Sequence, residues 1–127
     1  MQKLHHSSED YDFLVLGGID GGKALELSKK LGFEDSKITP SMISRKVGDA
    51  GAASSLLALS KVLESTLVGQ HVILCSYGAG AGADTISLTA REEVRPTAGA
   101  RYEDYLAQKE YIDYTTYIKL RKILARH

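Results

Sequence analysis

The chain of 127 residues is long enough for one domain with a hydrophobic core and too short for two. Its 16 lysines and arginines balance its 16 aspartates and glutamates, so no net field attracts nucleic acid or an anionic membrane. No apolar run reaches the ~18 residues of a membrane span, and one cysteine cannot form an internal disulfide. We therefore expect a cytoplasmic protein without membrane or nucleic-acid partners.

The first part of the chain predicts a strand followed by a helix. Residues 1–10 are polar and irregular, and we expect them to form a disordered leader. The apolar run 13–16 ends at two glycines, which is typical of a strand buried on both faces. Asp20 then precedes an amphipathic helical pattern with a glycine cap at Gly32. Residues 34–47 are expected to be a polar connection.

A second helix is predicted from about residue 49 to residue 67. Its first turns contain only small residues, which indicates close packing against a neighbouring helix. An apolar stripe continues along it through Leu56, Leu59, Leu63 and Leu67. Past its first turn, Lys61 and Glu64 are the only charged residues, so the pattern predicts a mostly buried central helix.

Two strands joined by a glycine-rich turn follow. Residues 71–75 are apolar, residues 78–82 alternate glycine and alanine, and residues 85–89 show the period of two that is typical of a strand. The order strand, helix, helix, strand, strand predicts an α/β domain over residues 11–95. Residues 96–127 should form a helical, tyrosine-rich tail.

The tail carries most of the aromatic residues of the chain. Tyr111, Tyr114 and Tyr117 recur every third residue, so they share one face of a helix. Such tyrosines more often pack than react, so we expect contacts within this chain or at an interface.

The glycine-rich turn allows two interpretations. A dinucleotide-binding loop needs a helix directly after it, whose N-terminus holds the phosphates, but the next segment predicts a strand. We therefore favour a tight strand-to-strand connection. Its exposed amides at Gly78, Ala79 and Gly80 form a candidate loop for an oxyanion or a thioester.

The remaining reactive side chains predict no further site. Cys75 lies in an apolar strand and is expected to be a buried structural thiol. The histidines lie at the termini or at a strand entry, at His5, His6, His71 and His127. With one cysteine they give no metal-ligand spacing, so we expect no metal site.

Ordered motifs in the chain resemble the C-terminal half of a condensing enzyme of the thiolase superfamily. They are residues 47–54 with the leucine-rich helix that follows, and residues 72–84 with the glycine turn. The tail, at 105–121, is similar to the extreme C-terminus of archaeal-type hydroxymethylglutaryl-CoA synthases, which are related to ketoacyl synthases of the third type. The resemblance covers most of residues 11–124. It implies half of a thiolase-like layered α/β fold and chemistry on coenzyme A thioesters.

The resemblance also implies site residues, two of which this chain lacks. The family histidine after the first strand falls at Gly17, and the family asparagine before the buried helix falls at Asp49. Glycine cannot transfer a proton, and an ionised carboxylate accepts hydrogen bonds but repels an oxyanion. We therefore expect no certain catalytic residue and no cofactor, with a coenzyme A thioester as the substrate class.

Two functional hypotheses follow, because the family's nucleophilic cysteine belongs to the half that this chain does not match. In the first, the chain is a subunit or paralogue that takes part in acyl-CoA condensation only with a chain carrying the missing half. In the alternative, it is a non-catalytic assembly protein that retains the fold and the interface. A decayed fragment without function is a third reading. The expected partners are a second copy or the missing half, and the resemblance adds a thiolase and a zinc-ribbon/OB-fold protein.

Overall fold

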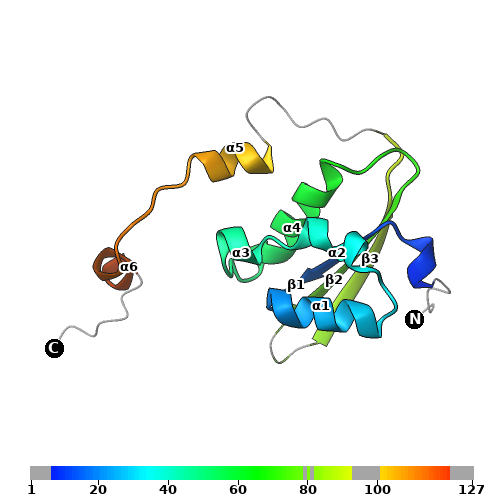
Figure 1. Cartoon of the computed structure of the whole chain (residues 1–127), viewed down its shortest axis with the longest axis horizontal. Coiled ribbons are helices and arrows are strands. Elements are labelled where there is room, and N and C mark those ends of the chain that lie inside the picture. Colours follow the sequence, from blue (N-terminus) through cyan, green and yellow to red (C-terminus); the bar gives the residue numbers. More distant parts are fainter. Residues whose placement is uncertain (1–6, 79, 81, 93–100, 121–127) are drawn as a thin grey trace.

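The computed structural model describes residues 7–78, 80, 82–92 and 101–120, and it forms a three-stranded sheet with helices on both faces (Figure 1). The strands are β1 (Phe13–Gly17), β2 (His71–Gly78) and β3 (Gly82–Thr89), in the order β1-β2-β3. β1 runs parallel to β2, and β3 is antiparallel to β2. The predicted α/β class is confirmed.

The layers follow from the alternation of side chains along β1. Val15 points into a core shared with Ala58 and Val62 of one helix, whereas Leu14 and Leu16 pack with Ala24 on the opposite face. Because successive residues of a strand face opposite sides, a continuous apolar run requires cover on both faces. The strand predicted at 13–16 is therefore buried by two separate layers.

The first layer contains α1 (Gly21–Lys30), and its ends match the predicted signals. The carboxylate of Asp20 accepts a hydrogen bond from the backbone N–H of Gly22 at 3.0 Å, which satisfies one orphan donor of the first turn. After the last turn, Gly32 adopts a φ of 79°, the left-handed conformation that ends many helices.

The opposite layer contains α4 (Ala53–Leu63), which is shorter and less buried than predicted. Its buried residues are Ser55, Ala58 and Val62, and Leu59 packs at the edge of the same core. Leu56 is 65% exposed. The expectation of a mostly buried helix over 49–67 is therefore wrong, because no described residue covers the outer face of α4.

The connection at 34–47 is helical and partly apolar, which corrects the prediction of a polar link. It contains α2 (Asp35–Ile38), a 3-10 turn η2 (Thr39–Ser41) and α3 (Ser44–Val47). Ile38 and Ile43 are buried in the two cores. These one-turn helices were missed because tertiary burial stabilises them, and each is too short to show a period.

The structure describes only part of the two chain ends. Residues 1–6 lie outside the described residues, but Ser8–Asp10 forms the 3-10 turn η1, and Lys37 Nζ donates to the Ser8 carbonyl at 3.1 Å. Residues 8–10 are thus ordered, and the leader expected over residues 1–10 stays a prediction for the rest. The predicted boundary between residues 95 and 96 lies outside the described residues.

The tail contributes two helices, α5 (Tyr102–Ala107) and α6 (Tyr114–Leu120). Figure 1 shows α5 next to the body of the domain and α6 well away from it. Among the described residues, none of the helices has both the length and the apolar character needed to cross a bilayer.

Candidate functional site

A cavity of about 670 Å³ lies where β1 ends, next to the two positions at which the resemblance expects catalytic residues. Its wall comes from the end of β1, the N-terminal end of α1, the segment from the end of α2 to the turn before α4, and the first half of α4. The polar and charged residues that line it are Asp20, Ser41, Ser44, Arg45, Asp49 and Ser54. Gly18 lies at its edge, directly after β1.

Gly17, the position that the resemblance matches to a histidine, has no space for a side chain. A Cβ atom placed on Gly17 would overlap the hydroxyl of Ser55, and it would lie 2.8 Å from the backbone Cα of Ser55. The nearest atoms belong to the α4 backbone as well as to a side chain, so a rotamer change cannot relieve the overlap. An imidazole at this position would require α4 to move away from β1.

Ser55 also ties α4 to the centre of the sheet. Its Oγ atom lies 2.9 Å from Oγ of Ser76, and the two hydroxyls share a partly buried hydrogen bond. Ser76 is the β2 neighbour of Gly17 in the strand register. A nucleophilic serine needs an adjacent base, and neither hydroxyl can supply one to the other. The pair therefore fixes the packing of α4.

Gly18 is required for a different reason. Its φ is 76°, which non-glycine residues rarely adopt, and a Cβ atom there would collide with the backbone carbonyl of Tyr77. The glycine pair that ends β1 is thus fixed by α4 on one side and by β2 on the other.

Asp49, the position that the resemblance matches to an asparagine, lines the cavity and is exposed. Its Oδ1 atom accepts a hydrogen bond from the backbone N–H of Gly51 at 2.8 Å, which forms a turn before α4. Ser54 Oγ accepts the N–H of Ala50 at 3.0 Å in the same turn. The carboxylate thus acts as an acceptor that shapes the backbone.

The charges around the cavity do not favour a highly anionic ligand. Asp20 and Asp49 contribute two carboxylates, and Arg45 is the only lysine or arginine among the described residues of the wall. The N–H groups at the start of α1 attract anions, but Asp20 already accepts one of these hydrogen bonds.

The glycine-rich turn forms a hairpin, as predicted. Gly78 pairs with Gly82 across β2 and β3, and Gly80 has a φ of 88°. Ala79 lies outside the described residues. The described glycines of the turn do not line the cavity, so the structure does not bring the candidate oxyanion loop of Gly78 and Gly80 into its wall.

Cys75 and His71 belong to the sheet and lie apart from the cavity. Cys75 is half-buried against the α1 layer, and Thr85 Oγ1 donates to its sulfur at 3.5 Å. His71 Nδ1 lies 3.0 Å from Thr89 Oγ1. Within the described part of the chain, no group of three metal-binding side chains comes together.

Sequence reasoning identified the positions of Gly17 and Asp49 but missed Ser55, Ser76 and Arg45. The small residues at the start of α4 were the available signal, because they predicted close packing there. They did not reveal that the closest approach is to the end of β1.

Comparisons with known proteins agree with this architecture. Residues 1–90 match the family described as 3-oxoacyl-[acyl-carrier-protein (ACP)] synthase III C terminal. Hydroxymethylglutaryl-CoA synthase from Methanopyrus kandleri is 34% identical over 127 residues, which cover 98% of this chain and 36% of that protein. The synthases from Methanocaldococcus jannaschii and Aeropyrum pernix are 32% and 34% identical, over 96% and 98% of this chain, and 36% of each is covered.

The matches cover different parts of this chain and only part of each relative. This chain spans little more than a third of the length of the curated relatives. The family match ends at residue 90, whereas the alignments with the synthases continue over nearly the whole chain, tail included.

Proposed function

This chain belongs to the family of 3-oxoacyl-[acyl-carrier-protein] synthase III C-terminal domains, and we propose that it works as a subunit that binds a polypeptide carrying the remaining part of a thiolase-like synthase. Two observations support this role. The relatives are nearly three times longer than the part matched by this chain. In addition, α4 has an uncovered outer face at Leu56 and Leu57. Exposed apolar patches of this kind usually mark interfaces.

Within such an assembly, Gly17 would allow α4 to pack against β1. It would supply no acid or base at the position that the resemblance matches to a histidine. The observation that carries this proposal is the contact between Gly17 and Ser55. Glycine has no side chain that could transfer a proton, and the overlap with Ser55 leaves no space for one at position 17. Any condensation chemistry would depend on groups of the partner.

A purely assembly-forming role is the second candidate, and the cavity charges favour it. A coenzyme A thioester carries several phosphate charges, whereas Asp20 and Asp49 outnumber Arg45 in the wall. We propose that the cavity binds such a thioester weakly or not at all without the partner. Calorimetric titration of the chain with acetyl-CoA tests this, and a Kd below about 10 µM for the isolated chain would favour the catalytic subunit instead.

The subunit role is tested by co-expression with a probe. The probe is the part of the Methanopyrus kandleri synthase that this chain does not match. Sedimentation velocity should show a 1:1 complex of probe and chain. The complete synthase is the matched control, because its own C-terminal part already occupies the surface, and it should not bind the chain. Absence of a complex at tens of micromolar would refute the proposal.

Other partner expectations remain proposals. The same sedimentation experiment distinguishes the missing part from a second copy of the chain, since a homodimer would form without the probe. A thiolase and a zinc-ribbon/OB-fold protein would be added to the preformed complex as candidate third components. The cytoplasmic location also stays a prediction.

A further inference from the structure

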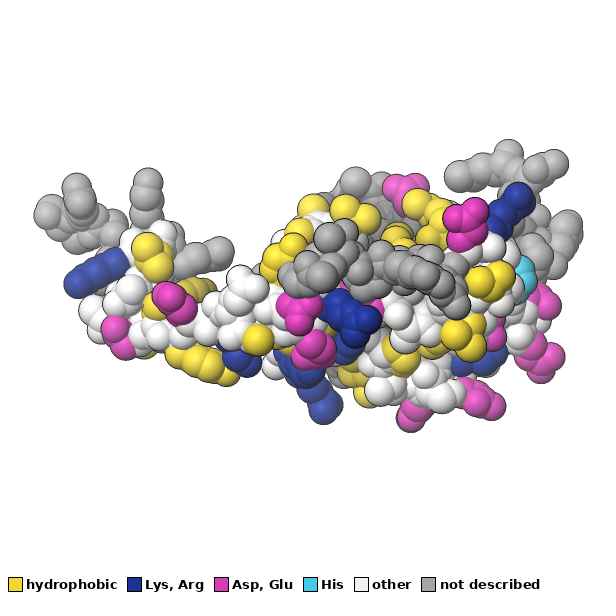
Figure 2. Space-filling view, turned by 90° about the horizontal axis from the view of Figure 1, so that it is seen from above, with side chains coloured by type: hydrophobic (Ala, Val, Ile, Leu, Met, Phe, Trp, Pro, Cys, Tyr) yellow, Lys and Arg dark blue, Asp and Glu magenta, His cyan; other side chains and the backbone are white. Residues whose placement is uncertain are grey.

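The tail projects from the domain and exposes large apolar side chains. We call residues 108–120, which include α6, the tail arm. Figure 2 shows hydrophobic side chains on the surface of this projecting part. The exposed ones are Tyr111, Ile112, Tyr114, Tyr117 and Leu120, with 87% of Tyr111 and 76% of Tyr114 accessible to solvent. So many apolar groups on one short segment need a surface to pack against.

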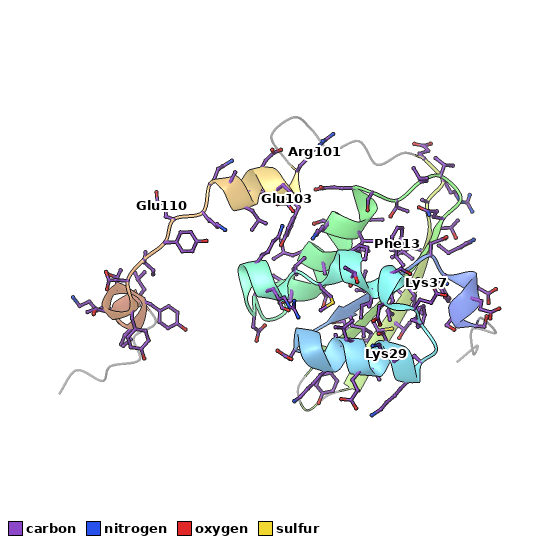
Figure 3. The ribbon with its side chains drawn as sticks, viewed as in Figure 1. Phe13, Lys29, Lys37, Arg101, Glu103 and Glu110 are labelled. Atoms are coloured by element: carbon purple, nitrogen blue, oxygen red, sulfur yellow. The ribbon has the colours of Figure 1, made fainter. Side chains whose placement is uncertain are left out.

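The arm starts from a firmly held helix. Tyr102 of α5 is buried in the core beside α4, and its backbone N–H donates to Glu64 Oε1 at 2.7 Å. Lys46 Nζ forms an ion pair with Glu103 at 3.0 Å. Figure 3 shows Glu103 on α5, Arg101 directly before this helix, and Glu110 on the segment that leads away. Packed residues therefore hold α5, at the base of the arm, against the domain.

The arm also contains a formed helix. Asp113 accepts two hydrogen bonds from Thr116, one from the backbone N–H and one from the hydroxyl, both at 2.9 Å. The rings of Tyr114 and Tyr117 stack with their centroids 6.3 Å apart. An isolated helix of two turns is unstable in water, so this helix needs a partner surface for its tyrosines.

The comparisons indicate which surface this is. The arm lies outside the family match, which ends at residue 90, but within the alignments with full-length hydroxymethylglutaryl-CoA synthases. The arm is shared with those long proteins, and it projects away from its own domain. The surface available to it is therefore the remaining part of such a protein. This remaining part is the part of the synthases that this chain does not match.

We infer that the tail arm docks onto the polypeptide that carries the remaining part of the synthase-like fold, with Tyr114 and Tyr117 packed in an apolar groove of that partner. The inference rests on the proposed function and adds the contact surface to it. Tyrosine suits this role because its rigid ring buries much apolar area and its hydroxyl still reaches a polar partner.

The test uses the full chain, the Methanopyrus kandleri probe and two double variants. Tyr114→Ser with Tyr117→Ser removes the apolar rings, and Tyr114→Phe with Tyr117→Phe retains them as the matched control. Because both side chains are exposed, neither variant should change the melting temperature. The serine variant should raise the Kd for the probe at least 10-fold, and the phenylalanine variant should stay within about 3-fold.

The outcomes separate this inference from the proposed function. A complex with an unchanged Kd for the serine variant overturns the arm contact but leaves the subunit role intact. No complex for the unaltered chain overturns both. Loss of self-association in the serine variant, with unchanged binding to the probe, would assign the arm to a second copy and would also overturn the inference.

Discussion

Gly17 and Ser55 are in direct contact, with the end of β1 lying against the backbone of α4. The hydrogen bond between the hydroxyls of Ser55 and Ser76 also links α4 to β2 beside this contact. The contact places a packed interface where the resemblance expects a catalytic imidazole. The absence of a side chain at position 17 and the position of α4 are therefore coupled features of this chain.

The first prediction concerns this contact. Gly17→Ala should lower the free energy of unfolding by about 1–3 kcal/mol, because a methyl group would be forced into a packed site. Ser55→Gly removes the hydroxyl and Cβ that the new methyl group meets. In a double-mutant cycle by urea denaturation, the two changes together should cost less than the sum of the single costs. If the losses of unfolding free energy for the two single variants simply add in the double variant, Gly17 and Ser55 are not in tight contact.

The glycine turn gives a second prediction with a built-in control. Gly80→Val should cost on the order of 1–3 kcal/mol, because Gly80 has a φ of 88° that a β-branched residue rarely adopts. Gly78, however, is not among the described glycines with positive φ, and a Cβ atom there meets nothing within 4 Å. Gly78→Val should therefore leave the melting temperature nearly unchanged, and equal losses for both variants would be inconsistent with this geometry.

Two leucines of α4 should separate folding from association. Leu59 is partly buried against the core, so Leu59→Glu places a charge at the edge of this core and should cost about 1–3 kcal/mol. Leu56 is 65% exposed, so Leu56→Glu should retain the melting temperature of the free chain and weaken its association with a partner. Circular dichroism and sedimentation velocity check the two properties. A Leu56 variant that unfolds would show that this face is covered within the chain.

The buried phenol of Tyr102 should make the free energy of unfolding depend on pH in the alkaline range. Burial, and to a lesser extent the charge of Glu103, raises the pKa of the Tyr102 phenol above its ordinary value of 10.0. The folded chain thus holds this proton more tightly than the unfolded chain. The contribution of this phenol to the free energy of unfolding is complete below about pH 10. It is lost as the pH rises through the higher pKa of the folded chain.

The variant Tyr102→Phe isolates this effect. Among the described residues the Tyr102 hydroxyl has no hydrogen-bond partner, so its removal should not reduce stability at neutral pH. The free energy of unfolding should then fall less steeply above pH 10 than in the unaltered chain. Tyr105→Phe, on the exposed side of α5, is the control and should leave the slope unchanged. Identical slopes for Tyr102→Phe and the unaltered chain would contradict the assigned pKa shift.

Local sequence patterns were sufficient for the elements that depend on local physics. The apolar run of β1, the Asp20 and Gly32 caps of α1 and the alternation in β3 each predicted the observed element. Their signals come from neighbouring residues, so no knowledge of the fold was needed.

The features that were missed depend on contacts between distant segments. Ser55 meets Gly17 only because α4 crosses the end of β1, and Ile38 and Ile43 are buried only because one-turn helices lie against the sheet. The exposed face of α4 was mispredicted for the same reason. Its leucines indicate an apolar environment, but the sequence alone does not reveal that the described part of the chain leaves Leu56 and Leu57 exposed.

The central claim is that an assembly containing this chain has no condensing activity, because it has no acid or base at position 17. It is tested by release of free coenzyme A from acetyl-CoA and acetoacetyl-CoA. The probe from the Methanopyrus kandleri synthase would be combined either with its own C-terminal segment or with this chain. We expect turnover with the first pair and none above a heat-treated control with the second, although both pairs form complexes. Comparable turnover by the two pairs would contradict the account, because catalysis would then proceed with glycine at this position.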